Sequence, residues 1–265
     1  MLEALLAALA GLLIGSFLNV CVYRLPRDRS VIRPRSFCPA CERPLAWYDN
    51  IPLASYVLLR GRCRHCSAAI SPRYPAVELL TGALFFFLVL SLGPTLQALK
   101  LCLFSGLLVG LIFSDLEQRI LPDEFTLGGT AAGLGLAALV PLDLPIAGLL
   151  FPWEWGPRVL SLAEALLGAV IGSGLLWLIG VVYQKARGRE GLGFGDVKMV
   201  AMIGAFLGLY GVLLTVLAGS LLGSVLGLLF IVATRKKAST YELPFGTFLG
   251  VAALGVALLW RSGMG

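Results

Sequence analysis

The sequence predicts an all-α polytopic membrane protein, with about eight transmembrane helices and a small cytosolic zinc-binding module inserted after the first. Three observations lead to this fold class. Of the 265 residues, 58% are hydrophobic and only 14% are charged, and the mean hydropathy is +0.89; soluble globular proteins differ strongly from this composition. Apolar stretches of the length that a bilayer requires recur along the chain. A polar segment with two C-x-x-C pairs interrupts them after the first stretch.

The first element is the apolar stretch 1–23, which has neither a basic n-region nor a small-residue cleavage site and is therefore expected to be a retained transmembrane helix. A polar module follows at 24–75, and a helical membrane core is expected over 76–265. The apolar segments of this core are 77–92, 96–114, 125–141, 161–183, 199–210, 212–233 and 245–260. The boundary Leu-Gly-Leu-Tyr-Gly at 207–211 leaves open whether 199–233 is two spans or one kinked helix, so seven spans is the competing count.

The distribution of basic residues predicts the topology, because Lys and Arg beside membrane spans stay in the cytosol. With eight spans, the segments 24–75, 115–124, 184–198 and 234–244 lie on one side of the membrane. They hold 10, 1, 4 and 3 of the 21 Lys and Arg residues. We therefore place the cysteine module in the cytosol and both termini outside, and the formal charge of +6 is mainly a topology signal.

The cysteine module carries the sequence CPAC and the sequence CRHC, separated by 21 residues. This spacing is close to that of zinc ribbons, in which two knuckles each offer two thiolates to a tetrahedral ion. Thiols persist as metal ligands in a reducing cytosol, where structural disulfides are rare. A pair of redox C-x-x-C motifs is the alternative. We expect one structural zinc per chain, held by Cys38, Cys41, Cys63 and Cys66.

Aspartates at the predicted membrane boundary are the candidate catalytic groups. Histidine-based hydrolysis is disfavoured because the chain has a single histidine, His65, while ionisable residues at or within spans are costly and point to function. Asp115 and Asp196 fall on the same predicted cytosolic face. Two close carboxyl groups in a low-dielectric site cannot both ionise easily, so one keeps a proton and the other activates water, as in aspartic proteases. Solvated charges at helix ends are the alternative.

The segment GLGFGD at 191–196 has three alternating glycines, which let a backbone bend sharply and approach a substrate strand. A nucleotide or S-adenosylmethionine loop begins similarly but needs a preceding strand and a soluble helix, and neither is expected here. Asp123 in Leu-Pro-Asp is expected to cap the fourth span and to support the site from outside it. The residues expected to support the catalytic loop are Gly191, Gly193, Gly195, Lys198 and Asp123.

Six motifs, in order along residues 15 to about 250, together resemble the bacterial prepilin peptidases, which are Gly-x-Gly-Asp intramembrane aspartyl proteases. They are GSFLNVCVYRLP (15–26), the paired C-x-x-C module, SPRYPAVELLTG (71–82), SDLEQRILPDEFT (114–126), GLGFGDVKM (191–199) and LPFGTFLG (243–250). The resemblance implies a multi-pass protein of the bacterial inner membrane that cleaves the basic leader of type IV prepilins or type II secretion pseudopilins, after a glycine and on the cytosolic side. It matches Asp115 and Asp196 to the two catalytic aspartates.

The resemblance also implies methylation of the new N-terminus with S-adenosylmethionine, although nothing here resembles a soluble methyltransferase fold. Two positions depart from the family pattern: Phe194 stands where tyrosine is common and Thr247 where proline is frequent, and neither is expected to touch a carboxylate. Polar residues beside the cysteine module are candidates for methyl transfer or substrate docking, with snorkelling and helix-end hydrogen bonding as the alternative. They are Asn19, Tyr23, Arg24, Arg73 and Glu78.

The expected partners are prepilins or pseudopilins and the lipid bilayer, and no nucleic acid. Two other classes of protein would share some of these features. A transporter would also place carboxylates in the membrane, but no internal repeat of the kind common in transporters is evident. A scaffold that uses its zinc module for docking would have no use for a pair of aspartates at helix ends. The aspartate pair therefore favours the peptidase.

Overall fold

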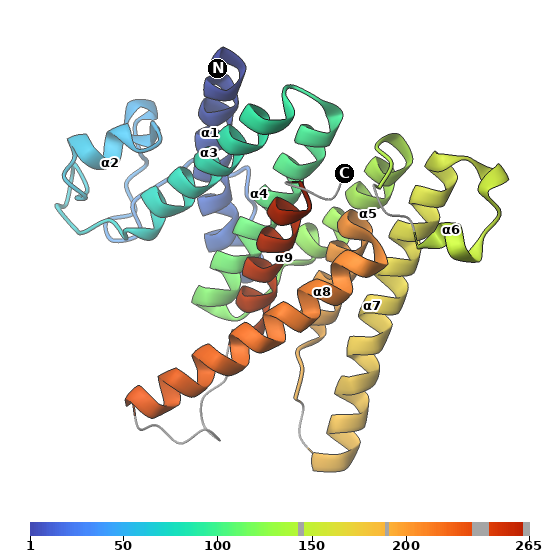
Figure 1. Cartoon of the computed structure of the whole chain (residues 1–265). Helices are drawn as coiled ribbons and strands as arrows, with labels where there is room; N and C mark the ends of the chain where they lie inside the picture. Colours follow the sequence, from blue (N-terminus) through green and yellow to red (C-terminus); the bar gives the residue numbers. More distant parts are fainter. Residues whose placement is uncertain (143–145, 189–190, 235–243, 262–265) are drawn as a thin grey trace. The chain divides into compact units, whose positions relative to one another are not determined.

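The computed structural model describes residues 1–142, 146–188, 191–234 and 244–261. By its internal contacts the chain forms two compact units, Met1–Phe113 and Ser114–Gly265. Each is described by itself. The helices are α1 (Leu2–Arg24), η1 (Leu25–Arg27), η2 (Trp47–Asn50), α2 (Ala54–Leu58), α3 (Arg73–Leu92), α4 (Leu96–Gln118), α5 (Asp123–Leu139), α6 (Ala147–Leu150), η3 (Trp153–Trp155), α7 (Pro157–Arg187), α8 (Phe194–Thr234) and α9 (Phe245–Arg261) (Figure 1).

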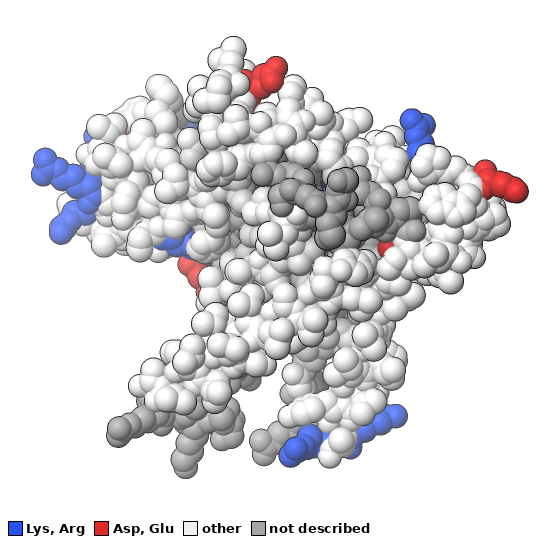
Figure 2. Space-filling view, viewed as in Figure 1, with Lys and Arg blue, Asp and Glu red and all other residues white. Residues whose placement is uncertain are grey.

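The helical membrane fold predicted from the sequence is confirmed. Helices α1, α3, α4, α7 and α8 are long and apolar enough to cross a membrane, while α5 and α9 have 17 residues each. Figure 2 shows little charge over the visible sides of α7 and α8, with basic side chains at the end of α7. The sequence placed several helix ends too far inward: α8 begins at Phe194, five positions before the apolar segment. Hydropathy finds the apolar stretch, whereas backbone hydrogen bonding continues through polar residues at its end.

In the first unit, α1 and α3 pack antiparallel with glycines between them. A Cβ atom on Gly11 would lie 2.8 Å from the carbonyl oxygen of Thr81, and one on Gly15 would lie 2.7 Å from the Cα of Glu78. Small residues allow this close backbone approach, which supplies much of the packing energy between helices in a membrane. The cysteine module is inserted between the end of α1 and the start of α3.

In the second unit, α8 packs against α5, α7 and α9. Glycines again set the spacing: a Cβ on Gly168 of α7 would lie 2.6 Å from the backbone of Gly208, and one on Gly133 of α5 would lie 2.8 Å from the Phe206 ring. Further along α8, Gly219 faces Leu249 of α9. The first half of α8 is thereby fixed against α5 and α7, and this half begins with the glycine motif.

Helix α8 is broken at Gly208, within the boundary at which the sequence left the span count open. Gly208 has φ 72° and ψ −175°, a backbone conformation outside the helix. The side chain of Glu164, which is 1% exposed, accepts hydrogen bonds from the N–H groups of Leu209 at 2.9 Å and Ala147 at 2.7 Å. These bonds satisfy an amide freed by the break. Glu164 was missed from the sequence, although a carboxylate within a predicted span is a signal that could have found it.

The loop between α5 and α7 contains α6 and η3, and the rings of Phe151 and Trp155 stack with centroids 5.1 Å apart. Residues 143–145 of this loop lie outside the described part of the chain. The predicted cytosolic segment 234–244 also lies outside it, except for its first and last residues.

Candidate active site and metal centre

Asp115 lies in the last turn of α4, with only 5% of its surface exposed. Its own carbonyl accepts the N–H of Arg119 at 3.0 Å, and Arg119 then takes φ 56°, in the left-handed region. The neighbouring Ser114 hydroxyl donates to the Ile120 carbonyl at 2.7 Å. The turn that leaves α4 is therefore closed by local hydrogen bonds, and this holds the carboxyl group of Asp115 at the helix end.

Asp196 lies in the first turn of α8. Its N–H donates to the Gly193 carbonyl at 3.1 Å, so the turn that starts the helix comes from the glycine motif itself. Asp196 as a residue is half-buried.

Gly246, in the first turn of α9, brings the two carboxyl groups together. A Cβ on Gly246 would lie 3.2 Å from Cγ of Asp115 and 3.2 Å from Oδ1 of Asp196. These two atoms are therefore separated by at most twice that distance, and the negative charge of Asp115 acts on Asp196. Two carboxyl groups this close can share the handling of one water molecule. The structure thus joins the two aspartates that the sequence selected, which lie 81 positions apart.

Thr247, beside Gly246, contacts Asp115 directly, and the expectation that this departure would not touch a carboxylate is wrong. Its backbone N–H donates to Oδ2 of Asp115 at 2.6 Å and its hydroxyl donates to the same oxygen at 2.8 Å. The expectation failed because a sequence does not show that the free N–H groups at the start of α9 meet the end of α4. The motif LPFGTFLG was the available signal for this residue.

The glycines of GLGFGD provide space between parts of the chain. The chain bends at Leu192 within the motif, although none of Gly191, Gly193 and Gly195 has a positive φ. A Cβ on Gly191 would meet the ring of Tyr183, one on Gly193 would lie 3.2 Å from Oδ2 of Asp196, and one on Gly195 would lie 3.2 Å from Leu121. Without side chains, the loop can lie against α7 and the segment after α4.

Asp123 and Lys198 form an ion pair at the start of α5 and α8. Nζ of Lys198 lies 2.6 Å from Oδ1 of Asp123 and 5.2 Å from the ring centre of Phe194. Asp123 is the first residue of α5, whereas the N-cap is Pro122 and no side-chain capping bond forms; the expectation that Asp123 caps this helix is wrong. Its carboxylate instead pairs with the lysine two positions after Asp196, so it ties α5 to the helix that carries Asp196.

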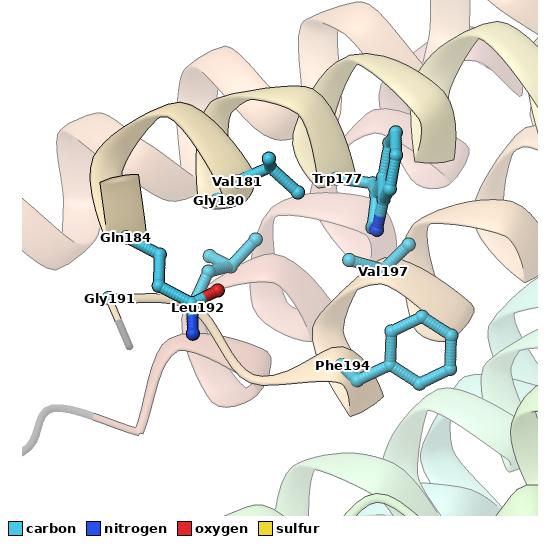
Figure 3. A pocket seen from close by; sticks show the side chains of 8 residues that line it. All are labelled: Trp177, Gly180, Val181, Gln184, Gly191, Leu192, Phe194 and Val197. Carbon is cyan, nitrogen blue, oxygen red and sulfur yellow. The ribbon is translucent and has the colours of Figure 1, made fainter. Parts of the chain in front are cut away.

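A hollow of about 180 Å³ lies beside the glycine motif, between the end of α7 and the start of α8. Figure 3 shows Trp177, Gln184 and Phe194 around it, with Leu192 and Val197 completing much of the wall. Mainly apolar walls with a few polar groups are typical of binding sites. Val197 follows Asp196 in the first turn of α8, but neither aspartate lines this hollow.

The four cysteines of the module form one cluster, with their sulfur atoms within 4.8 Å of one another. Their two knuckles are built alike. The Cys38 N–H donates to the Arg43 carbonyl at 3.0 Å, and 25 positions later the Cys63 N–H donates to the Ala68 carbonyl at 2.9 Å. Each knuckle thus presents its sulfur pair from the same kind of turn, as expected from the repeated C-x-x-C spacing.

The cluster fits a tetrahedral metal ion. Zinc binds thiolates at about 2.3 Å, which places two sulfur ligands about 3.8 Å apart; Sγ of Cys38 and Sγ of Cys66 are 3.8 Å apart. Backbone hydrogen bonds from Cys66 and His65 lower the pKa of the Cys63 thiol to about 6, which favours its metal-binding thiolate form at neutral pH. Against a hydrogen bond from the Ala68 backbone, burial and the neighbouring thiols raise the pKa of Cys66 to about 11. The four residues could therefore hold a metal ion with no coordination position left open.

The polar residues flanking the module have structural partners in the first unit. Asn19 donates to the Tyr74 carbonyl at 3.0 Å, and Glu78 accepts the Leu53 N–H at 2.9 Å. Arg24 is buried and donates to the carbonyls of Ser30 and Arg35. These bonds attach the module to α1 and α3.

The remaining two candidates, Tyr23 and Arg73, each take part in a contact between a guanidinium group and an aromatic ring. The guanidinium of Arg27 lies 4.4 Å from the Tyr23 ring centre, and that of Arg73 lies 4.5 Å from the Tyr74 ring centre. The contacts at Tyr23 and Arg73 also lie where the module meets the helices. Asn19, Arg24 and Glu78 thus help to hold the module, whereas the ring contacts of Tyr23 and Arg73 stay within α1–η1 and within α3.

Comparisons with known proteins match almost the whole chain. The model of the bacterial peptidase A24 N-terminal domain matches residues 9–92, and that of the type IV leader peptidase family matches residues 102–228. No solved structure matches the chain significantly.

Several curated relatives carry the name prepilin leader peptidase/N-methyltransferase. The protein of Myxococcus xanthus is 42% identical over 232 residues, which are 88% of this chain and 64% of that relative. The protein of Aeromonas hydrophila is 37% identical over 96% of this chain and 90% of the relative, and that of Neisseria gonorrhoeae is 36% identical over 87% and 83%. The chain therefore belongs to the type IV leader peptidase family.

Proposed function

We propose that this chain is a membrane aspartic endopeptidase that removes the leader from type IV prepilins, with Asp115 and Asp196 as its catalytic residues. The observation that carries the proposal is the meeting of the two carboxyl groups at Gly246, a position with no side chain. Membership of the type IV leader peptidase family supports the substrate. The same family pattern extends the proposal to type II secretion pseudopilins.

The chemistry follows from the pair of carboxyl groups. One carboxylate takes a proton from a water molecule while the water oxygen attacks the peptide carbonyl carbon, and the other carboxyl group gives its proton to the carbonyl oxygen. The hollow between the end of α7 and the start of α8 would hold part of the peptide. The ion pair between Lys198 and Asp123 supports the start of α8, and the three motif glycines let the loop lie close to its neighbours.

Replacement of either aspartate tests this proposal. In membranes that contain the protein and a prepilin, we expect Asp115→Asn and Asp196→Asn each to abolish cleavage, because neither amide can act as the base or return the proton. Glu124→Gln is the matched control, since Glu124 is exposed and lies in the first turn of α5. Near-normal cleavage by either aspartate variant would refute the assignment and leave a transporter or scaffold as the better description.

We also propose that the cysteine cluster holds one structural zinc ion per chain. When bound, the metal supplies cross-links within the module, and a four-cysteine site has no open position for catalysis. The proposed division of the chain is a first transmembrane helix at 1–23, a zinc module at 24–75 and a protease core at 76–265. The basic residues of the module favour its placement, with the aspartates, on the cytosolic side of the bacterial inner membrane.

The second proposed activity is methylation of the new N-terminus with S-adenosylmethionine as donor. The names of the relatives pair a peptidase with an N-methyltransferase, which supports this activity. Asn19, Tyr23, Arg24, Arg73 and Glu78 remain the candidate residues for it or for substrate docking. The mass of the released pilin tests both activities in one measurement, because cleavage removes the leader and methylation adds one methyl group. An unmethylated product from a wild-type protein supplied with the donor would refute the second.

A further inference from the structure

Thr247 makes the surroundings of the two aspartates unequal. It is the third residue of α9, and the N–H groups of a first helical turn have no acceptor within the helix. Its N–H and its hydroxyl both donate to Oδ2 of Asp115, at 2.6 and 2.8 Å. The carboxyl group of Asp115 therefore serves as the acceptor that closes the start of α9. Because Thr247 is 8% exposed and Asp115 is 5% exposed, these hydrogen bonds are sheltered from competing water.

Asp196 has weaker support for a negative charge. Within the described residues, its carboxyl group interacts with the backbone of Gly193 and with the charge of Asp115. Asp196 lies in the first turn of α8. Asp115 lies in the last turn of α4 and meets the first turn of α9, so the two helix ends beside it act on its charge in opposite senses. The charged groups that face Asp115 are Asp196 from α8 and Arg119 from the end of its own helix. Two donated hydrogen bonds and a nearby cation thus favour the ionised form of Asp115 over that of Asp196.

We infer that Thr247 divides the work of the pair: it holds Asp115 as the ionised base, so that Asp196 carries the proton. This inference rests on the proposed peptidase function and adds a positioning residue to it. Asp115 takes a proton from water as the water oxygen bonds to the carbonyl carbon, and Asp196 protonates the carbonyl oxygen. When the C–N bond breaks, Asp115 protonates the departing nitrogen and Asp196 recovers a proton from a hydroxyl of the intermediate. Both groups then regain their starting states.

Three substitutions separate the two hydrogen bonds of Thr247. Thr247→Ser keeps both donors. Thr247→Val keeps the N–H and a similar side-chain shape but removes the hydroxyl. Thr247→Pro removes both donors, and proline is sterically tolerated in a first helical turn. None of the three replaces a carboxyl group, so an altered pH profile reports on the surroundings of the pair.

The experiment is the pH dependence of kcat for cleavage of a prepilin by the full-length protein in detergent or liposomes. Below the acidic limb the base is protonated, so loss of a donor to Asp115 moves this limb to higher pH, by about one pH unit for each hydrogen bond lost. We expect Thr247→Ser to follow the wild type, Thr247→Val to shift the acidic limb and Thr247→Pro to shift it further. The alkaline limb, which reports the proton on Asp196, should move less.

Two results would overturn the inference. If the acidic limb of Thr247→Val is unchanged, the Thr247 hydroxyl does not stabilise the ionised form of Asp115. If the alkaline limb shifts more than the acidic limb, Asp115 is the group that carries the proton. If Thr247→Pro unfolds, Thr247→Val alone decides. Failure of the proposed function would look different, because the wild type would then show no cleavage or Asp115→Asn would retain it.

Discussion

Gly246→Ala is the sharpest test of the site geometry. The added methyl carbon would lie 3.2 Å from Cγ of Asp115, 3.2 Å from Oδ1 of Asp196 and 3.0 Å from a methyl carbon of Leu121. Favourable contacts between heavy atoms begin at about 3.5 Å, so each neighbour must move by a few tenths of an ångström. The methyl group would also occupy space between the carboxyl groups.

The expected magnitude follows from this displacement. A misplacement of 1 Å costs about a hundredfold in rate, so a shift of about half that size should lower kcat roughly tenfold. Overpacking costs about 1–3 kcal/mol of stability, and replacement of a helical glycine returns about 0.5–1 kcal/mol. We therefore expect a folded protein with impaired cleavage.

Initial rates of prepilin cleavage over a range of substrate concentrations, together with the thermal unfolding midpoint, measure both effects. Gly135→Ala is the matched control, because Gly135 lies in α5 and an added Cβ would have no atom within 4 Å. It should cleave at the wild-type rate and be slightly more stable. A folded Gly246→Ala protein with the wild-type kcat would refute the view that chemistry occurs between Asp115 and Asp196.

Two further predictions concern the ion pair and the metal. Lys198→Met and Asp123→Asn should each lower the cleavage rate, and the double variant should be no slower than the worse single one; additive losses would show that the pair does not act as a unit. The side chains of Lys198 and Asp123 are 23% and 56% exposed, so the ion pair should contribute only about 0.5–1 kcal/mol to the free energy of unfolding. Metal analysis should give about one zinc per chain. The Cys38→Ser, Cys63→Ser double variant should lose this zinc, and the control Cys102→Ala should keep it. A folded, metal-free wild type would contradict the zinc site.

Much of the fold could be predicted because the membrane imposes strong patterns. The predicted apolar segments of the membrane core lie on helices, apart from the last two residues of 125–141, and the cysteine spacing anticipated the clustered sulfur atoms. The ends of α7 and α8 could not be placed from hydropathy, since polar residues continue a helix where apolar ones stop. The break at Gly208 was located only as an uncertain boundary, because it depends on the approach of Gly168 and on the carboxylate of Glu164 from another helix.

In the candidate site, too, some residues could be identified from the sequence and others only from the tertiary contacts. Asp115 and Asp196 are visible in the sequence because carboxylates at the ends of apolar segments are unusual. Thr247 lies 132 positions from Asp115, and its donors matter only because α9 starts where α4 ends. Lys198 and Asp123 were selected as support, but their pairing depends on the contact between α5 and α8. Local sequence identified the charged groups, whereas the groups that orient them depend on tertiary contacts.

Convergence of helix starts explains how two carboxyl groups can be placed together near a membrane. Helices α8 and α9 both direct their first turn at the pair, through Asp196 itself and through Gly246 and Thr247. Free N–H groups and the positive end of each helix dipole lie there, and they offset part of the cost of a buried negative charge. Such an approach requires positions without side chains, which Gly193 and Gly246 supply. The glycine motif and the LPFGTFLG motif therefore serve one purpose, which is to let helix ends reach the aspartates.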